Sequence, residues 1–298
     1  MNRTARIRFG TTQWLYVLPA VVLVLVFVYF PVIWNVWLSF FSWSAFSTKT
    51  IFVGLDNYAQ LGADPIFWAA LFNNVAYAVV SVIFQVGGGL VLAAILEEVV
   101  IARWRDFFRT VYFIPAVMSL TVVGFLFYFL YEPNFGLVNQ GLNAIGLGRY
   151  AHAWLGEQST AIWSIIAMSQ WQSTGYVMVL FIVAIQKIPR ELYEAAYIDG
   201  ASKLRAFFSV TVPLVRQMTE LMLIITISGA FLVFNEVWVM TQGGPNNASH
   251  TLGTWLYKSA FFNDQNGYAA AIGTVIFVIT LAASIVQLRL NRGKTVEF

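Results

Sequence analysis

The hydrophobic residues of this chain form long uncharged stretches, separated by shorter segments that carry the charges. A bilayer core needs roughly 20 consecutive apolar residues in a helix, and each span must satisfy its own backbone hydrogen bonds in lipid. The pattern therefore predicts six transmembrane helices in an all-α integral membrane fold. Their approximate ranges are 15–40, 71–96, 111–130, 161–185, 221–240 and 269–288. A tail at 1–13 would precede this transmembrane domain at 14–298.

The composition supports lipid as the main solvent. The chain has 298 residues, of which 59% are hydrophobic and only 10% charged, whereas a soluble domain carries about 25% charged residues. Cysteine is absent, which excludes disulfides and thiolate metal sites. The two histidines, His152 and His250, both fall in predicted loops. We therefore expect no metal and no catalytic centre in this chain.

The basic residues give the orientation. Fourteen of the 17 lysines and arginines lie in the amino tail, the carboxyl tail or the loops after spans two and four. Lysine and arginine concentrate on the cytoplasmic side of membrane proteins, so both termini are predicted to be cytoplasmic. The arrangement along one membrane face also argues against nucleic-acid binding, despite a pI of about 9.1. Arg3, Arg6 and Arg8 precede an apolar run longer than a signal-peptide core, which predicts a retained first span.

The longest predicted cytoplasmic connection is the segment 186–219, called the motif loop below. Pro189 suits the start of a helix, and Glu191 and Glu194 suit its positive end. Gly200 can take the left-handed conformation that ends a helix, and a second helix is predicted at 201–210. Geometry alone leaves two alternatives open. The pair of amphipathic helices could project as a knob for a partner, or it could lie on lipid headgroups.

The motif loop resembles the signature of binding-protein-dependent ABC permeases, which is Glu-Ala-Ala, three residues, Gly, nine residues, then Ile-x-Leu-Pro. The matching residues here are Glu194, Ala195, Ala196, Asp199, Gly200 and Pro213. Val210 and Val212 stand where the family has Ile and Leu. The resemblance implies that the segment 189–213 docks on a separate ATPase subunit.

Further segments are similar to the carbohydrate-uptake branch, which includes the maltose and glycerol-3-phosphate permeases. They are Phe108-Arg109-Thr110 with Ile114-Pro115, Gly136-Leu137-Val138-Asn139, Trp154-Leu155 and Thr241-Gln242-Gly243-Gly244-Pro245. The resemblance implies a type I importer permease fold in a bacterial inner membrane, and a sugar or sugar-like cargo. It implies a second permease, two ATPase subunits that bind ATP and Mg, and an external solute-binding protein as partners.

Polar residues inside spans are candidates for substrate contact because they are costly in lipid. Four polar residues of span four recur at i, i+3, i+4 and i+7, on one helical face: Ser169, Gln172, Ser173 and Tyr176. Packing between helices is the alternative for this stripe. In span five, Asn235 and Glu236 are further candidates, and Glu236 could contact either the substrate or the partner permease. The absence of amides at Gly229 and Ala230 departs from maltose-type permeases and argues against maltose itself.

Other functions fit less well. Gly293-Lys294-Thr295 is reminiscent of a phosphate loop, but the glycine that such a loop needs five residues earlier is replaced by Leu288. We therefore expect ATP hydrolysis in a separate subunit. A proton- or sodium-coupled carrier would show more spans and inverted repeats, and an intramembrane enzyme would need a catalytic pair within the spans.

Overall fold

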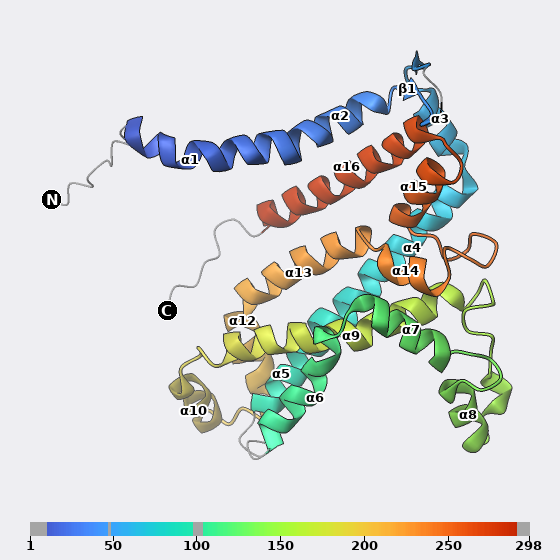
Figure 1. The fold of residues 1–298 in the computed structure, drawn as a ribbon. Coiled ribbons are helices and arrows are strands. Elements are labelled where there is room, and N and C mark those ends of the chain that lie inside the picture. The colour runs from blue at the N-terminus through green and yellow to red at the C-terminus, as the bar shows by residue number, and fades with distance from the viewer. Residues whose placement is uncertain (1–10, 47–48, 98–103, 291–298) are drawn as a thin grey trace.

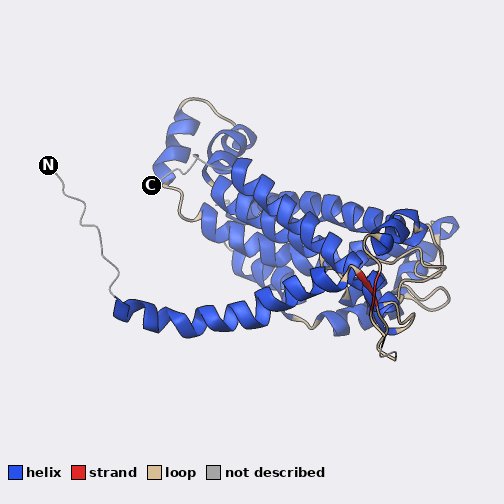
Figure 2. Ribbon diagram, turned by 90° about the horizontal axis from the view of Figure 1, so that it is seen from above, coloured by secondary structure: helices blue, strands red, loops and turns tan. Residues whose placement is uncertain are grey.

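The computed structural model describes residues 11–46, 49–97 and 104–290, which form an elongated bundle of helices (Figure 1). Viewed from above, the long helices run side by side along the bundle, and the loops gather at one end (Figure 2). The start of α1, the end of α16 and α10 lie at the other end, which we call the motif end (Figure 1). The end that carries β1, α8 and α14 is called the opposite end.

The helices and two short strands follow one another along the chain in three groups. The first third of the chain contains α1 (Thr11–Val24), η1 (Leu25–Tyr29), α2 (Phe30–Leu38), β1 (Phe41–Ser42), β2 (Ile51–Phe52), α3 (Asp56–Ala63), α4 (Pro65–Ser81), η2 (Val82–Gly88) and α5 (Gly89–Glu97). The middle contains α6 (Arg105–Val117), α7 (Leu120–Leu130), α8 (Leu137–Ala144), η4 (Gly148–Tyr150) and α9 (Ala161–Ile185). The remainder contains α10 (Arg190–Ile198), α11 (Lys203–Ala206), η5 (Phe207–Thr211), α12 (Val212–Leu214), α13 (Arg216–Phe231), α14 (Asn235–Met240), α15 (Leu252–Phe261) and α16 (Asn266–Leu290).

Among the residues that the structure describes, four helical stretches are long and apolar enough to cross a membrane, or six if each of two bent pairs counts as one span. The range predicted for span three contains a bend of 98° between α6 and α7. It follows Pro115, where Met118 and Ser119 adopt extended backbone conformations. The range predicted for span five is also interrupted, because α13 ends at Phe231 and α14 begins at Asn235. Hydropathy alone does not reveal either interruption.

Helix α9 is the centre of the bundle, with α4, α5, α6, α7, α13 and α14 packed around it. Two glycines permit close approaches between α9 and its neighbours. A Cβ atom at Gly89 would lie 3.2 Å from the backbone nitrogen of Met178 in α9, and one at Gly175 would overlap the carbonyl oxygen of Tyr112 in α6. Within the triple glycine 87–89, therefore, only Gly89 meets a neighbouring helix.

The first span is attached differently. No residue in the apolar window of Tyr16–Leu38 is buried within this chain, and α1 projects away from the bundle (Figure 1). Near the opposite end, the side-chain amide of Asn35 in α2 donates to the carbonyl oxygen of Ala270 in α16 at 3.1 Å. The first span is thus fixed at one end and presents apolar side chains along the rest of its length.

Candidate functional site

The motif loop folds into two helical arms joined at a glycine, as predicted. α10 begins immediately after Pro189, with Glu191 in its first turn. Gly200 ends this arm with a φ of +78°, which confirms the left-handed conformation. The backbone nitrogen of Ala201 then donates to the carbonyl oxygen of Ala196 at 2.9 Å, so the turn closes back on the helix end.

The second arm starts two residues later than the sequence predicts, at Lys203. Ser202 explains the start, because its hydroxyl caps the helix by accepting a hydrogen bond from the backbone nitrogen of Arg205 at 3.3 Å. The arm continues through η5 and α12, where Pro213 lies, and then turns by 71° into α13.

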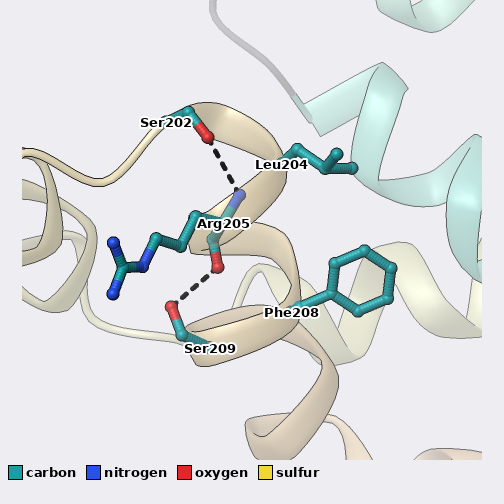
Figure 3. Close-up of a pocket in the computed structure, with 5 residues that line it drawn as sticks. All are labelled: Ser202, Leu204, Arg205, Phe208 and Ser209. Carbon is teal, nitrogen blue, oxygen red and sulfur yellow. Dashed lines mark hydrogen bonds between the residues drawn. The ribbon is translucent and has the colours of Figure 1, made fainter.

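The two arms present apolar side chains to the surroundings. Ile198 is 85% exposed, and Leu204 and Phe208 are about two-thirds exposed. Leu204 and Phe208 line an open cavity of about 430 Å³ together with Ser202, Arg205 and Ser209 (Figure 3). Exposed apolar patches rimmed by polar groups mark interaction sites. The surface can therefore bind an apolar partner, with Arg205 and Glu194 able to add charged contacts.

The predicted motif residues are divided between the two arms. Glu194, Ala195 and Asp199 are exposed, and Ala196 is half-buried. Gly200 forms the turn, and Pro213 lies at the far end of the second arm. Helix α10 contains no buried residue. The structure thus keeps the motif at the surface and not inside the bundle.

The polar stripe predicted in span four lies on one continuous helix but has two different environments. Ser169 and Gln172 are buried, Ser173 is half-buried and Tyr176 is 46% exposed. The Gln172 side chain donates to the carbonyl oxygen of Met118 at 3.1 Å, where the bend after α6 leaves that oxygen free. Gln172 therefore contributes to packing between helices, whereas Tyr176 faces outward from this chain.

The interruption of span five separates the other two candidates. Asn235 is exposed, while Glu236 is 9% exposed and accepts a hydrogen bond from the hydroxyl of Tyr77 at 3.3 Å. Ser169 reaches the same tyrosine from α9. The structure therefore brings Glu236 and Ser169 together around Tyr77 and gives Glu236 a partner within its own chain.

The sequence analysis missed the polar face of α4 and η2, which supplies Tyr77. This face also carries Asn74, Ser81 and Gln85, and all four residues are buried. Ser81 accepts hydrogen bonds from the amides of Gln85 and Gln170, at 3.3 and 3.2 Å. The spacing of these residues resembles that of the stripe in span four, so the same search for polar residues on one face would have found them.

Two asparagines of α4 bind the loop that follows span five. The Asn73 amide donates to the carbonyl oxygens of Ala248 and His250, both at 2.8 Å. Asn74 donates to the carbonyl oxygen of Ala230 at 2.6 Å and accepts from the backbone nitrogen of Leu252 at 2.8 Å. The bond to Ala230 satisfies a carbonyl oxygen that the interruption of span five leaves without a helical partner. The other bonds hold the loop and the start of α15 against α4.

His250 lies at the centre of this loop and is completely buried. Its Nδ1 shares a hydrogen bond with the Thr254 hydroxyl at 3.0 Å. Burial, aided by the positive charge of Lys258, lowers the pKa of His250 to about 4. Gly243 makes room for the ring, because a Cβ atom there would overlap it. Since the histidine is neutral and enclosed, its role is structural.

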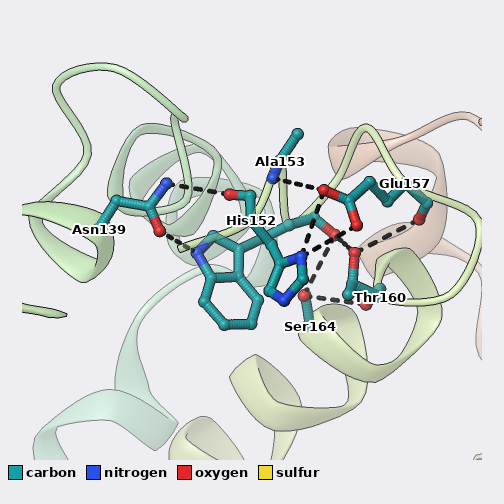
Figure 4. Close-up of polar contacts among 7 residues, drawn as sticks. Asn139, His152, Ala153, Glu157, Thr160 and Ser164 are labelled. Atoms are coloured by element: carbon teal, nitrogen blue, oxygen red, sulfur yellow. Dashed lines mark hydrogen bonds and ion pairs between the residues drawn. The ribbon is translucent and has the colours of Figure 1, made fainter. Parts of the chain in front are cut away.

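The connection between α7 and α9 is held by a second polar cluster (Figure 4). The amide of Asn139 donates to the His152 carbonyl oxygen at 2.9 Å, and its oxygen accepts from the Trp154 indole at 2.7 Å. Glu157 accepts from the backbone nitrogen of Ala153 at 3.0 Å and pairs with His152. Asn139 and Trp154, both in segments similar to the permease family, thus stabilise one loop.

Within the described residues, no group of three or more His, Cys, Asp or Glu side chains is placed to hold a metal ion. The segment Gly293-Lys294-Thr295 lies outside the described residues, as do the tail arginines Arg3, Arg6 and Arg8.

The amino-acid sequence is similar to those of known transport permeases over almost its whole length. The chain is 54% identical over 276 residues to the probable ABC transporter permease protein YurN of Bacillus subtilis, covering 93% of this chain and 94% of that protein. It is 35% identical to the lactose transport system permease protein LacF of Rhizobium radiobacter, covering 94% and 93%. It is 31% identical to the trehalose/maltose transport system permease protein MalF of Thermococcus litoralis, covering 98% of each.

The fold is similar to that of a chain in a crystal structure of a bacterial ABC transporter involved in the import of the acidic polysaccharide alginate. The TM-score is 0.79 at 24% identity, covering 94% of this chain and 96% of that one. Residues 85–296 match the family described as the binding-protein-dependent transport system inner membrane component. With this match over most of its length and the relatives above, the chain belongs to that family of membrane-spanning transport subunits.

Proposed function

We propose that this chain is one of two permease subunits in an ATP-driven importer of a sugar or sugar-like solute. Its partners would be a second permease, two ATPase subunits that bind ATP and Mg, and an external solute-binding protein. Both termini and the motif loop would then be cytoplasmic. Relatives named for lactose, trehalose/maltose and arabinooligosaccharide transport support the choice of solute class.

The observation that carries the proposal is the exposed surface of the motif loop formed by Glu194, Ile198, Leu204 and Phe208, called the motif surface below. Ile198, Leu204 and Phe208 leave apolar area uncovered, and Glu194 is exposed on α10, the arm that also carries Ile198. A separate ATPase with an apolar cleft and a basic group would cover both. When ATP closes the ATPase pair, the two attached loops would move together and shift the permease from one conformation to the other.

The residues that are candidates for contact with the solute fall into two groups. Ser173, Tyr176 and Asn235 are half-buried or exposed in the isolated chain and are available to a solute between two permeases. Ser169 and Glu236 sit around Tyr77 and would position these residues. We assign Gln172 to the same supporting group, because its amide is engaged with the Met118 carbonyl oxygen.

The test is uptake and co-purification with Glu194→Lys and Gly200→Asp. The first reverses a charge on the motif surface, and the second places a side chain where φ is +78°. Both should reduce uptake to background and uncouple ATP hydrolysis from the solute, while the wild-type chain brings down a second permease and an ATPase. Normal uptake by either variant would refute the proposal, and a ligand screen on the cognate binding protein would identify the solute.

A further inference from the structure

The attachment of α10 to the rest of the chain raises a mechanical problem. The helix has no buried residue, and it is joined to the second arm through Gly200, where an added Cβ atom would meet nothing within 4 Å. An exposed glycine turn of this kind is locally compliant. Residues 186–189 join α10 directly to α9, but on its other side a displacement of α10 reaches the second arm and α13 only through this turn, unless a further contact bridges the two arms.

Tyr193 provides such a contact. Its hydroxyl shares a hydrogen bond with the Thr211 hydroxyl at 2.9 Å, across 18 residues of sequence. Thr211 is only 4% exposed, and the Tyr193 ring packs against the cluster that contains Ile188 and Val215. Burial also raises the pKa of Tyr193 above its ordinary value. The bond is therefore shielded from water on the Thr211 side.

Thr211 is connected directly to span five. Its carbonyl oxygen accepts from the backbone nitrogen of Val215 at 3.0 Å, and the Val215 carbonyl oxygen accepts from the backbone nitrogen of Thr219 at 3.0 Å. Thr219 lies in the first turns of α13. A hydrogen-bonded path thus runs from α10 through the second arm into the helix that ends at the interruption beside Asn235.

We infer that Tyr193 and Thr211 form a positioning pair that carries movement of α10 to α13 past the compliant turn at Gly200. This inference rests on the proposed function, since it assumes that an ATPase moves α10. It assigns a role in coupling to two residues outside the exposed motif surface. The pair would set how much solute moves for each ATP hydrolysed, and would leave docking of the ATPase unchanged.

The experiment uses the complete transporter, with its ATPase subunits and binding protein, in lipid nanodiscs or vesicles. Tyr193→Phe and Thr211→Val each remove one hydroxyl and keep the surrounding shape. Because one hydrogen bond is lost, each should lower the solute transported per ATP by roughly three- to tenfold, with ATPase assembly unchanged and the unfolding temperature lowered only slightly. The double variant should be no worse than either single variant, because both remove the same bond.

Two controls separate this role from a general structural one. Thr211→Ser retains the hydroxyl and should restore the ratio of transport to ATP hydrolysis. Tyr197→Phe removes a hydroxyl from the exposed side of α10 and should leave the ratio unchanged.

Three outcomes would overturn the inference. They are an unchanged ratio in both single variants, additive losses in the double variant, and loss of ATPase assembly in place of the ratio. Glu194→Lys, measured in parallel, distinguishes this failure from failure of the proposed function. If Glu194→Lys abolishes uptake while Tyr193→Phe has no effect, only the positioning pair is wrong. If Glu194→Lys also transports normally, the proposed function is wrong.

Discussion

The two ends of the molecule differ in how many of their side chains are buried and hydrogen-bonded within the chain itself. At the opposite end, Asn73, Asn74 and Thr251 are buried and bonded to backbone groups of neighbouring segments. At the motif end, α10 has no buried residue, and Ile198 is 85% exposed. At one end, buried side chains of the same chain bond to the backbone of neighbouring segments, whereas at the other the helix α10 has none of its residues buried.

The difference follows from what each end must do. Non-helical backbone near the membrane is tolerated only where its hydrogen bonds are satisfied, and Asn74 and Thr251 satisfy the carbonyl oxygens of Ala230 and Val233 at the interruption of span five. A surface that binds a separate, moving partner must instead leave its side chains exposed in the isolated chain. Substitutions at the opposite end should therefore affect folding, and substitutions at the motif end should affect assembly and coupling.

The largest expected effect is on stability at the opposite end. Asn74→Leu keeps a similar volume but leaves the Ala230 carbonyl and the Leu252 amide without partners. Each unsatisfied buried group costs about 1–3 kcal/mol, so the purified protein should lose roughly 2–6 kcal/mol and unfold at a clearly lower temperature in detergent. Asn263→Leu, an exposed position in the same region, should change the unfolding temperature little. Equal effects of the two variants would contradict the comparison.

The next effect is on assembly at the motif end. Ile198→Ser removes an exposed apolar side chain that a docked ATPase would cover. Burying an isoleucine is worth about 1.5–3 kcal/mol, so affinity for the ATPase should fall at least about tenfold, with no change in thermal unfolding. The matched variant is Phe46→Ser, because Phe46 is 90% exposed at the opposite end. Co-purification of the ATPase should survive this second change, and its loss there would contradict a surface confined to the motif end.

The effect that is smallest near neutral pH, and grows only as the pH falls, comes from His250. The folded-state pKa of His250 is about 4, below its ordinary value of 6.5, so the unfolded chain binds this proton first as pH falls. Stability should therefore decrease between about pH 6.5 and 4, by roughly 1 kcal/mol per pH unit, and be independent of His250 above that range. Thermal unfolding of wild type and His250→Asn should show the steeper pH dependence in wild type. Identical slopes would mean that His250 is not held neutral in the folded state.

Much of the architecture could be predicted from the sequence. Hydropathy located the helical stretches because lipid demands about 20 apolar residues in each span, and the spacing from Glu194 to Pro213 identified the family. Local rules were also sufficient for the turn at Gly200, where a glycine follows an amphipathic helix and takes a positive φ.

Other features depended on contacts between segments. The sequence spacing places the polar residues from Ser169 to Tyr176 on one face of a helix. Neighbouring helices nevertheless bury Ser169 and leave Tyr176 exposed. The partner of Glu236 could not be predicted from span five, because Tyr77 comes from a helix 159 residues away. The hydrogen bond between Tyr193 and Thr211 joins two arms whose separate helical patterns do not fix their relative placement.

The sequence by itself determined that this chain crosses a membrane, belongs to the binding-protein-dependent permeases and carries a motif loop of two short helices. These properties follow from composition and from spacing along the chain, which do not require knowledge of neighbours. The tertiary structure decided where spans bend, which polar residues support one another and how α10 is attached to α13. Those properties depend on which distant segments pack together, because burial and hydrogen-bond partners are set by proximity in space.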